Sequence, residues 1–383
     1  MSRQILTGAA IFDGAALHEG RALIVEDGHI AAITDQPPPG PVVALGGGVL
    51  APGMIDLQVN GGGGVMVDGS ATAESLAALC ALHARLGATG ILPTLITDSP
   101  DATAAVLAAG IRAARDEVPG FLGLHLEGPH LDPARPGAHD PQLIRPMTEA
   151  DLARLCEAAR ALPVLLVTLA PAAVTTDQIA RLTRAGVIVS LGHAACSHAQ
   201  ALAAHAAGAR MVTHLFNAMS GLGHREPGLA GAALALDIDV GLIADGHHVH
   251  PVTMRLALQA KRRGRVFLVS DAMAVAGSAL EGFTLNGRAI RRAGGRLTLA
   301  EGTLAGADLT LPQAVAVMIR EVGLPPERAL AMATSLPAAA AGLEARHGRI
   351  APGRVADLVH LPSLTDAGPD ARPSVWRAGQ RLV

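Results

Sequence analysis

The chain has 383 residues, half of them hydrophobic, and a formal net charge of −3. This length suffices for one large domain with its own core and a smaller domain beside it. So mild a charge gives no support for nucleic acid or an anionic membrane as a partner. The three cysteines form no Cys-x-x-Cys pair, which argues against a disulfide framework and a thiolate zinc site.

The N-terminal residues show no long apolar run leading to a small-residue cleavage site, so no signal peptide is predicted. The most apolar stretch, residues 162–174, is too short to span a bilayer. We therefore expect a soluble cytoplasmic protein.

The two ends of the chain have the pattern of short strands broken by turns. Near the N-terminus, turn pairs such as Asp13-Gly14 and Asp27-Gly28 separate the apolar runs, and residues 348–360 and 374–383 look similar. Because chain termini often lie close together, we predict that residues 1–50 and 346–383 pair into one small β-sandwich domain.

Residues 51–345 alternate between apolar strand runs and Ala- and Leu-rich helical stretches. Such alternation predicts a parallel sheet covered by helices, and eight units in this length predict a (β/α)8 TIM-type barrel. A doubly wound sheet is the alternative; it is less favoured because polar residues follow nearly every strand, not a single switch point. The expected strands are 49–59, 90–97, 121–126, 164–170, 187–191, 211–215, 240–244 and 266–270, and the expected helices include 73–86, 102–116, 149–161, 176–185, 197–207 and 251–260.

Four polar residues stand where predicted strands end: Glu127, His193, His214 and Asp271. Barrel enzymes project their catalytic groups from these ends, and such a set suits a divalent metal of the zinc or iron type. Each has a structural alternative: a loop carboxylate at Glu127, a helix cap at His193, a core histidine at His214 and an N-cap at Asp271. The coincidence of all four favours the metal site. No such role is expected for His18, His83, His205 and His347.

Several segments of the sequence together resemble one family. They include His-Leu-Glu-Gly-Pro at 125–129, Thr-His-Leu-Phe-Asn-Ala-Met at 213–219 and Arg-Glu-Pro-Gly-Leu-Ala-Gly at 225–231, besides residues 52–61, 243–249 and 268–271. In these segments the chain resembles the N-acetylglucosamine-6-phosphate deacetylases of the amidohydrolase superfamily. The resemblance runs from about residue 5 to the end of the chain.

The resemblance implies hydrolysis of the acetamide of N-acetyl-D-glucosamine 6-phosphate to D-glucosamine 6-phosphate and acetate. It implies that one divalent metal ion, commonly zinc or iron, is held by Glu127, His193 and His214. Asp271 would be the base that takes a proton from the attacking water, and His139 would contact the acetyl carbonyl.

The resemblance also implies a site for the sugar phosphate, formed by Asn217, Ala218, Arg225 and His248. A homodimer is expected, with Arg225 or His248 reaching the site from a second subunit. His247 competes with His248 for this role, and the Asp-Gly-x-His spacing favours His248.

The sequence departs from the superfamily in ways that bear on the metal. Many amidohydrolases carry His-x-His after the first strand, whereas Gln58 and Asn60 stand here, and amides are poor zinc ligands. The sole lysine, Lys261, precedes the eighth strand and lies at the wrong end of the barrel to bridge two metals. We therefore expect a single metal ion. Ala172 occupies a position after the fourth strand where an acidic residue is expected, and we have no account of its effect.

Three alternative functions remain open. The same reaction on N-acetylgalactosamine 6-phosphate differs by the configuration of one hydroxyl. Another amidohydrolase, acting on a different amide, would have no reason to keep a phosphate clamp. A catalytically inactive scaffold barrel would be expected to have broken metal ligands, and none of the three is broken.

Overall fold

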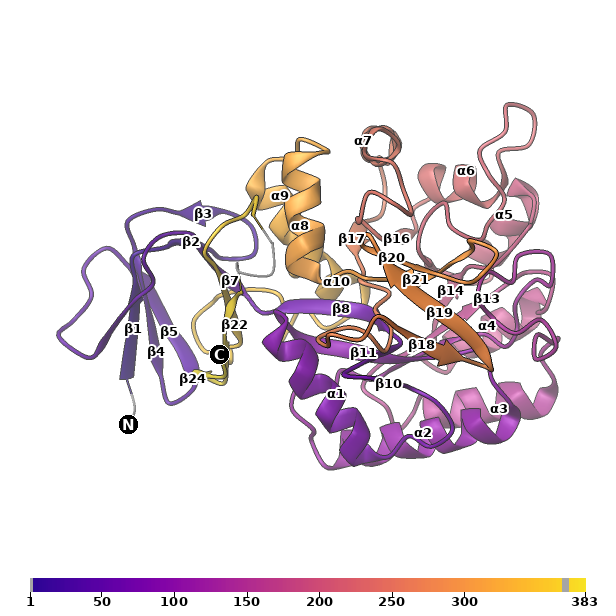
Figure 1. The fold of residues 1–383 in the computed structure, drawn as a ribbon, viewed down its shortest axis with the longest axis horizontal. Coiled ribbons are helices and arrows are strands. Elements are labelled where there is room, and N and C mark those ends of the chain that lie inside the picture. The colour runs from indigo at the N-terminus through magenta and orange to yellow at the C-terminus, as the bar shows by residue number, and fades with distance from the viewer. Residues whose placement is uncertain (1–2, 367–371) are drawn as a thin grey trace.

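The computed structural model describes residues 3–366 and 372–383. Figure 1 shows the first strands and the last strands of the chain together at one side of the molecule, with the α/β body on the other side. The chain thus begins and ends in the same β-rich part.

Eight parallel strands form the body, each paired with its neighbour in chain order. The ends of this sheet meet: the Asp271 N–H donates to the Gln58 carbonyl at 3.1 Å, and the Asn60 N–H donates to the Ala272 carbonyl at 2.8 Å. The sheet is therefore a closed barrel, as predicted, and not a doubly wound sheet. Its strands are β8 (Met54–Val59), β11 (Ala88–Ile96), β12 (Leu124–Glu127), β13 (Leu165–Leu169), β14 (Ile188–Leu191), β15 (Met211–Val212), β16 (Asp239–Leu242) and β17 (Val266–Leu268).

Helices surround the barrel, and most begin where the sequence supplies a capping residue. In the helices that begin at Ala73, Glu149, Thr176, His198 and Leu311, the capping Ser or Thr side chain accepts from the third helical N–H, and the side chain of that third residue accepts from the N–H of the capping residue. No helix of the described residues is long and apolar enough to cross a membrane. The helices are α1 (Ala73–Arg85), α2 (Pro100–Arg115), α3 (Glu149–Ala158), α4 (Thr176–Arg184), α5 (His198–Ala206), α6 (Gly228–Ala235), α7 (Pro251–Ala260), α8 (Leu311–Arg320), α9 (Pro326–Ala333) and α10 (Ser335–Ala340).

The first predicted strand, residues 49–59, is two strands in the structure. It divides at Gly53 into β7 (Val49–Pro52) and β8, and β7 belongs to the terminal β part. A Cβ at Gly53 would lie 1.9 Å from the Thr89 hydroxyl, so only glycine fits where the chain passes into the barrel.

The terminal β part consists of two sheets. In the larger one, β7 lies between β2 (Ala10–Phe12) and β22 (Leu358–Leu361), so both ends of the chain share one sheet. The apolar core of the terminal β part draws on both sheets and includes Leu23, Leu50 and Trp376. The six-stranded sheet holds β24 (Gln380–Arg381), β23 (Ser374–Arg377), β22 (Leu358–Leu361), β7, β2 (Ala10–Phe12) and β3 (Leu17–His18); the four-stranded sheet holds β5 (His29–Thr34), β4 (Ala22–Glu26), β1 (Arg3–Thr7) and β6 (Val42–Ala44).

Two small sheets stand outside these layers. A β-meander follows the eighth barrel strand and crosses in front of the barrel in Figure 1. It has its own apolar cluster, to which Val275, Ile290 and Leu297 belong. We did not predict these strands. The meander is β18 (Gly282–Leu285), β19 (Arg288–Ala293), β20 (Arg296–Thr298) and β21 (Leu304–Ala307), and the other sheet is the hairpin of β9 (Gly61–Gly62) and β10 (Val65–Met66).

Candidate active site

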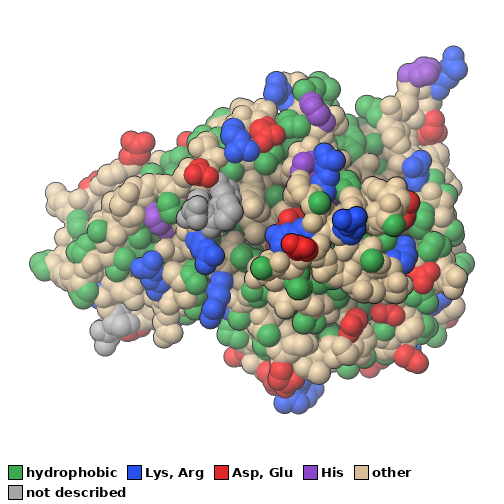
Figure 2. Space-filling model, viewed as in Figure 1, with side chains coloured by type: hydrophobic (Ala, Val, Ile, Leu, Met, Phe, Trp, Pro, Cys, Tyr) green, Lys and Arg blue, Asp and Glu red, His purple; other side chains and the backbone are tan. Residues whose placement is uncertain are grey.

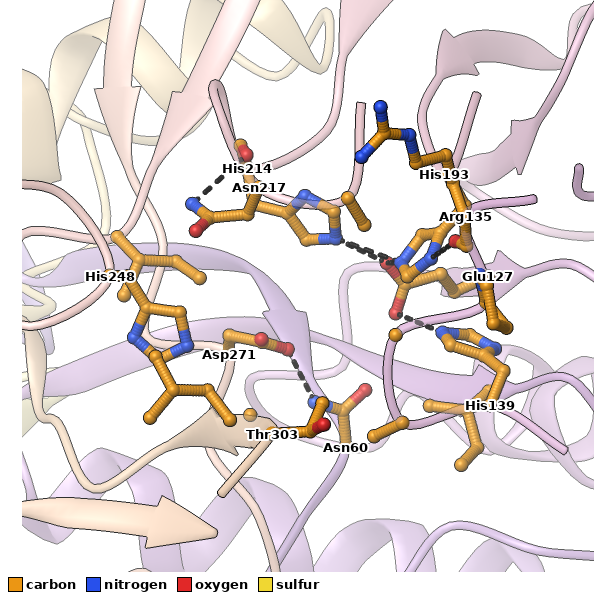
Figure 3. Close-up of a pocket in the computed structure, with 18 of the residues that line it drawn as sticks. Asn60, Glu127, Arg135, His139, His193, His214, Asn217, His248, Asp271 and Thr303 are labelled. Atoms are coloured by element: carbon orange, nitrogen blue, oxygen red, sulfur yellow. Dashed lines mark hydrogen bonds and ion pairs between the residues drawn. The ribbon is translucent and has the colours of Figure 1, made fainter. Parts of the chain in front are cut away.

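A cavity of about 510 Å³ opens at the carboxyl ends of the barrel strands. Of the residues expected to bind the metal, the acetyl group or the sugar phosphate, it brings together all except Arg225, as Figure 3 shows for most of them. Those lining it are Glu127, His139, His193, His214, Asn217, Ala218, His248 and Asp271. A barrel places strand ends in a ring, which is why residues so far apart in sequence meet here.

Three of these residues have backbone conformations that side chains rarely adopt. His193, His214 and Asp271 have φ values of 44°, 29° and 51°. Left-handed backbone is costly for residues other than glycine and is kept where the surroundings enforce it, often at functional sites. Here it turns the chain two or three residues after β14, β15 and β17 end, where the chain enters the mouth of the barrel.

Three ligand atoms converge at the bottom of the cavity. His214 Nε2 lies 2.9 Å from Glu127 Oε1 and 3.1 Å from His193 Nε2, and His193 Nε2 lies 3.3 Å from Glu127 Oε1. His193 Nδ1 donates to the Arg135 carbonyl at 2.9 Å, which leaves the lone pair of Nε2 facing the other two atoms. One carboxylate oxygen and two imidazole nitrogens at this spacing fit a zinc or iron ion.

The charges at this position follow from burial and close contact. Burial alone would raise the pKa of Glu127, but its close contacts with His193 and His214 outweigh burial and hold the pKa well below the usual value. Burial would lower the pKa of His214, yet the contact with Glu127 raises it. Glu127 is therefore an ionised carboxylate, the form that binds a cation. The other nitrogen of His214, Nδ1, is buried without a hydrogen-bond partner among the described residues.

His139 lies beside the three ligand atoms but is set up as a donor. Its Nδ1 lies 2.8 Å from the Thr97 hydroxyl and accepts from the Thr97 N–H at 3.2 Å; because the backbone N–H can only donate, the proton of the neutral ring is on Nε2. Burial lowers the pKa of His139 to about 3, which keeps the ring neutral. Nε2 is 3.7 Å from Glu127 Oε2. The ligand atoms of Glu127, His139 and His193 also lie within 4.8 Å of one another, but the protonated Nε2 makes His139 a hydrogen-bond donor instead of a ligand.

Asp271 is held by two amide side chains. Its Oδ1 accepts from Gln58 Nε2 at 3.0 Å and from Asn60 Nδ2 at 2.7 Å. Burial and the negative charge of Glu127 raise its pKa to about 6, which makes it a stronger base than an exposed carboxylate. The sequence suggested Gln58 and Asn60 only as missing metal ligands, whereas the structure shows that they orient this carboxylate.

His248 lines the opposite side of the cavity, and its ring is oriented by Asp245. Its Nδ1 lies 2.6 Å from Asp245 Oδ2, so Nδ1 carries the proton that this bond needs and Nε2 is left for a ligand. Asp245 Oδ1 accepts the N–H groups of His247 and His248 at 2.8 Å each. His247 does not line the cavity; it accepts from Arg296 outside it. The geometry favours His248 over His247.

Arg225 is not in the cavity of its own chain. It lies exposed on the loop before α6, which projects from the body in Figure 1 and ends in basic and histidine side chains in Figure 2. Ala172 is exposed and does not line the cavity either.

Other lining residues escaped the sequence analysis. They are Arg135, in the loop after β12, and several meander residues, among them Leu285, Thr303 and Leu304. The pair Asn286-Gly287 between apolar runs is a hairpin signal that would have revealed the meander.

Comparisons with known proteins agree with this geometry. Residues 49–380 match the model of the amidohydrolase family. The chain is 39% identical to the N-acetylgalactosamine-6-phosphate deacetylase of Shewanella sp. strain ANA-3, over 99% of the chain and 95% of that protein.

Solved structures are similar over the whole chain. The N-acetylglucosamine-6-phosphate deacetylase of Pasteurella multocida superposes with a TM-score of 0.92 at 31% identity, covering 99% of both chains. A mutant of the Mycobacterium smegmatis enzyme of the same name, in complex with N-acetyl-D-glucosamine 6-phosphate, superposes with a TM-score of 0.90 at 32% identity over the full length of both chains.

The barrel and its cavity are thus those of a hydrolase that acts on amide bonds, and the chain belongs to the amidohydrolase family. Within that family it is similar to the hexosamine-6-phosphate deacetylases along nearly its entire length.

Proposed function

We propose that this protein hydrolyses the acetamide of N-acetyl-D-glucosamine 6-phosphate, releasing D-glucosamine 6-phosphate and acetate. The observation that carries the proposal is the shape of the cavity. One end combines a metal-ligand triangle with the base Asp271 and the donor His139, and the other end presents His248 and Asn217. The names of the relatives identify the substrate class that fits both ends.

The residues of the chain divide the reaction between them. A divalent ion held by Glu127, His193 and His214 would polarise the acetyl carbonyl and acidify the attacking water. Asp271 takes the proton of that water and delivers it to the amine nitrogen, so that one carboxylate serves as base and then as acid. His139 donates from Nε2 to the carbonyl oxygen as it becomes negative; removing one such donor costs roughly 3 kcal/mol in other enzymes.

One metal ion per chain is part of the proposal. A second ion would need imidazole ligands where Gln58 and Asn60 stand. Amides are poor zinc ligands, and these two are already bonded to Asp271. Elemental analysis of gently purified protein is expected to give a value near one, with zinc or iron as the metal. A reproducible value near two would contradict this.

The substrate assignment is tested by steady-state kinetics with three sugars. N-acetylglucosamine 6-phosphate should have the highest kcat/KM, and unphosphorylated N-acetylglucosamine should be a poor substrate because His248 and Asn217 then have no phosphate to hold. Equal kcat/KM for both would refute the phosphate site. The third sugar, N-acetylgalactosamine 6-phosphate, is the second candidate substrate. The 39% identity to a relative named for it favours including it, and a higher kcat/KM for this sugar would replace the first proposal.

We also propose that two copies of the chain form a homodimer. Arg225 carries the charge that a phosphate needs, yet it lies outside the cavity of its own chain. On α7 and on the loop that carries Arg225, Leu222, Val252 and Leu256 are 64%, 50% and 60% exposed. Exposed apolar side chains of this size suit a surface that a second copy covers. Sedimentation showing a fully active monomer at micromolar concentration would refute this arrangement.

A further inference from the structure

A layer of polar side chains crosses the barrel interior one step below the metal-ligand triangle. The hydroxyls of Ser190 and Thr213 lie 2.6 Å apart, those of Thr213 and Thr168 lie 2.6 Å apart, and Thr168 Oγ1 lies 2.7 Å from His125 Nε2. All four residues are buried. Barrels usually fill such layers with branched apolar residues, and buried hydroxyls stabilise no better than those. Stability alone does not account for this layer.

The hydrogen bonds of this layer run in one direction. Thr94 donates its own proton to a backbone carbonyl of its strand, so His125 Nδ1 is the donor of their 3.4 Å contact. In the neutral ring, His125 Nε2 must then accept from Thr168. Thr168 accepts from Thr213, and Thr213 accepts from Ser190. Each hydroxyl proton has one defined partner, so the side chains are fixed instead of free to rotate.

Thr168 is the residue of this layer that touches all three ligand-bearing segments. It stands opposite Glu127 in the register of β12 and β13. Its hydroxyl bonds to Thr213, which directly precedes His214. Its methyl group packs against Gly192, which directly precedes His193: a Cβ built on Gly192 would lie 2.7 Å from Thr168 Cγ2.

Two of the ligands need such support. His193 and His214 have left-handed backbone conformations, which persist only when surrounding contacts enforce them. His214 Nδ1 has no hydrogen-bond partner among the described residues, although ligand histidines usually donate this N–H to a partner that fixes the ring. The position of the His214 ring therefore depends on its backbone, and the layer fixes the residue before it.

We propose that Thr168 is a positioning residue, whose hydroxyl and methyl group hold the segments bearing Glu127, His193 and His214 at the spacing that binds the metal. This inference rests on the proposed metal site. It assigns the affinity for the ion in part to a side chain that is not a ligand.

The test compares Thr168→Val with Thr168→Ser. Valine keeps the shape but removes the hydroxyl, and serine keeps the hydroxyl. Zinc affinity is measured directly, by competition of the metal-free protein with a chromogenic chelator. Thr168→Val is expected to bind zinc about 10- to 100-fold more weakly than the unaltered protein, the usual effect of losing a group that orients a ligand. Thr168→Ser keeps the hydroxyl but lacks the methyl group that packs against Gly192, so it should bind zinc more tightly than Thr168→Val and less tightly than the unaltered protein.

Thr334→Val is the matched control. Thr334 is also buried, and its hydroxyl donates to the Leu330 carbonyl at 2.8 Å, within the helices outside the barrel. It should lower the thermal stability of the metal-free protein as Thr168→Val does, without changing zinc affinity. If Thr168→Val does not fold, Thr213→Val removes the next hydroxyl of the layer and should weaken zinc binding likewise.

The outcomes are distinguishable. Zinc affinity in the valine variants equal to that of the unaltered protein, with only stability lowered, would show that the layer is merely structural and overturn the inference. Failure of the unaltered protein to bind zinc or iron would overturn the proposed metal site itself, and this inference with it.

Discussion

The side chains that we propose for catalysis and substrate binding share one arrangement: one polar atom is bound by the protein and the other faces the cavity. His139 is held through Thr97, His248 through Asp245, and Asp271 through Gln58 and Asn60. This arrangement fixes which nitrogen carries the proton and leaves little rotamer freedom to lose when substrate binds.

Asp271→Asn tests the base at this scale. The amide preserves the shape and the metal ligands but cannot accept a proton, so kcat should fall at least about 100-fold while the metal content stays the same. Asp245→Asn is a useful comparison at the other end of the cavity. It should raise KM for the 6-phosphate and affect kcat less, because the phosphate is remote from the amide. An Asp271→Asn enzyme with more than about a tenth of the original kcat would disprove the assignment.

The sequence pointed to the polar residues that line the cavity better than to those that orient them. Polar residues rarely end buried strands, so those that do are recognisable in the sequence: Glu127, His193, His214 and Asp271. Thr168 and Ser190 are not recognisable in this way, because single hydroxyls within apolar runs are common. Only their hydrogen bonds to Thr213 in the structure show that they belong to one layer.

Helix starts were predictable because capping depends on residues close together in the sequence. The helix α3 begins at Glu149 as expected, with Thr148 accepting from the Asp151 N–H. The meander was missed although Asn286 and Gly287 form its first two-residue turn, with φ values of 48° and 75°. Its strands depend on pairing with one another more than on any strong apolar alternation.

The start of α3 also provides a test of stability against pH. Burial alone would raise the pKa of Asp151, but hydrogen bonds from Arg145, at 2.5 and 2.7 Å, and from Thr148 hold it well below the usual value. A pKa that is lower in the folded state gives stability that is present above the unfolded value of 3.8 and is lost as the pH falls through the folded value.

Asp151→Asn should therefore lower the free energy of unfolding by about 1–2 kcal/mol at pH 7. The difference from the unaltered protein should begin to shrink below about pH 5. Urea unfolding of the metal-free protein at pH 7, 5 and 4 measures this. Asp177→Asn, at the exposed start of α4, is the control and should cost less than about 0.5 kcal/mol at every pH. A difference that does not change with pH would mean that the carboxylate charge is not what stabilises α3.

The number of barrel units came from the sequence pattern, whereas the course of the loop that bears Arg225 did not. Strand order follows from eight alternating units, and the return of the C-terminal strands to β7 follows from their β pattern. No periodicity tells whether the loop bearing Arg225 folds over its own cavity or projects, because a Gly- and Pro-containing loop carries no repeating apolar pattern. The structure shows it projecting (Figure 1).

Mixing two variants decides which copy supplies Arg225. Arg225→Ala and Asp271→Asn dimers should each have low kcat/KM on the 6-phosphate. In a mixed dimer, the site that keeps Asp271 receives Arg225 from the other copy if this residue acts across the interface. Random exchange makes half of the dimers mixed, each with one intact site of two, so about a quarter of the original kcat/KM should return. If Arg225 acted within its own chain, no site in the mixed dimer would be intact. Differently tagged copies would establish that mixed dimers had formed, and activity that stayed low in them would place Arg225 in its own cavity and require its loop to fold back over the site.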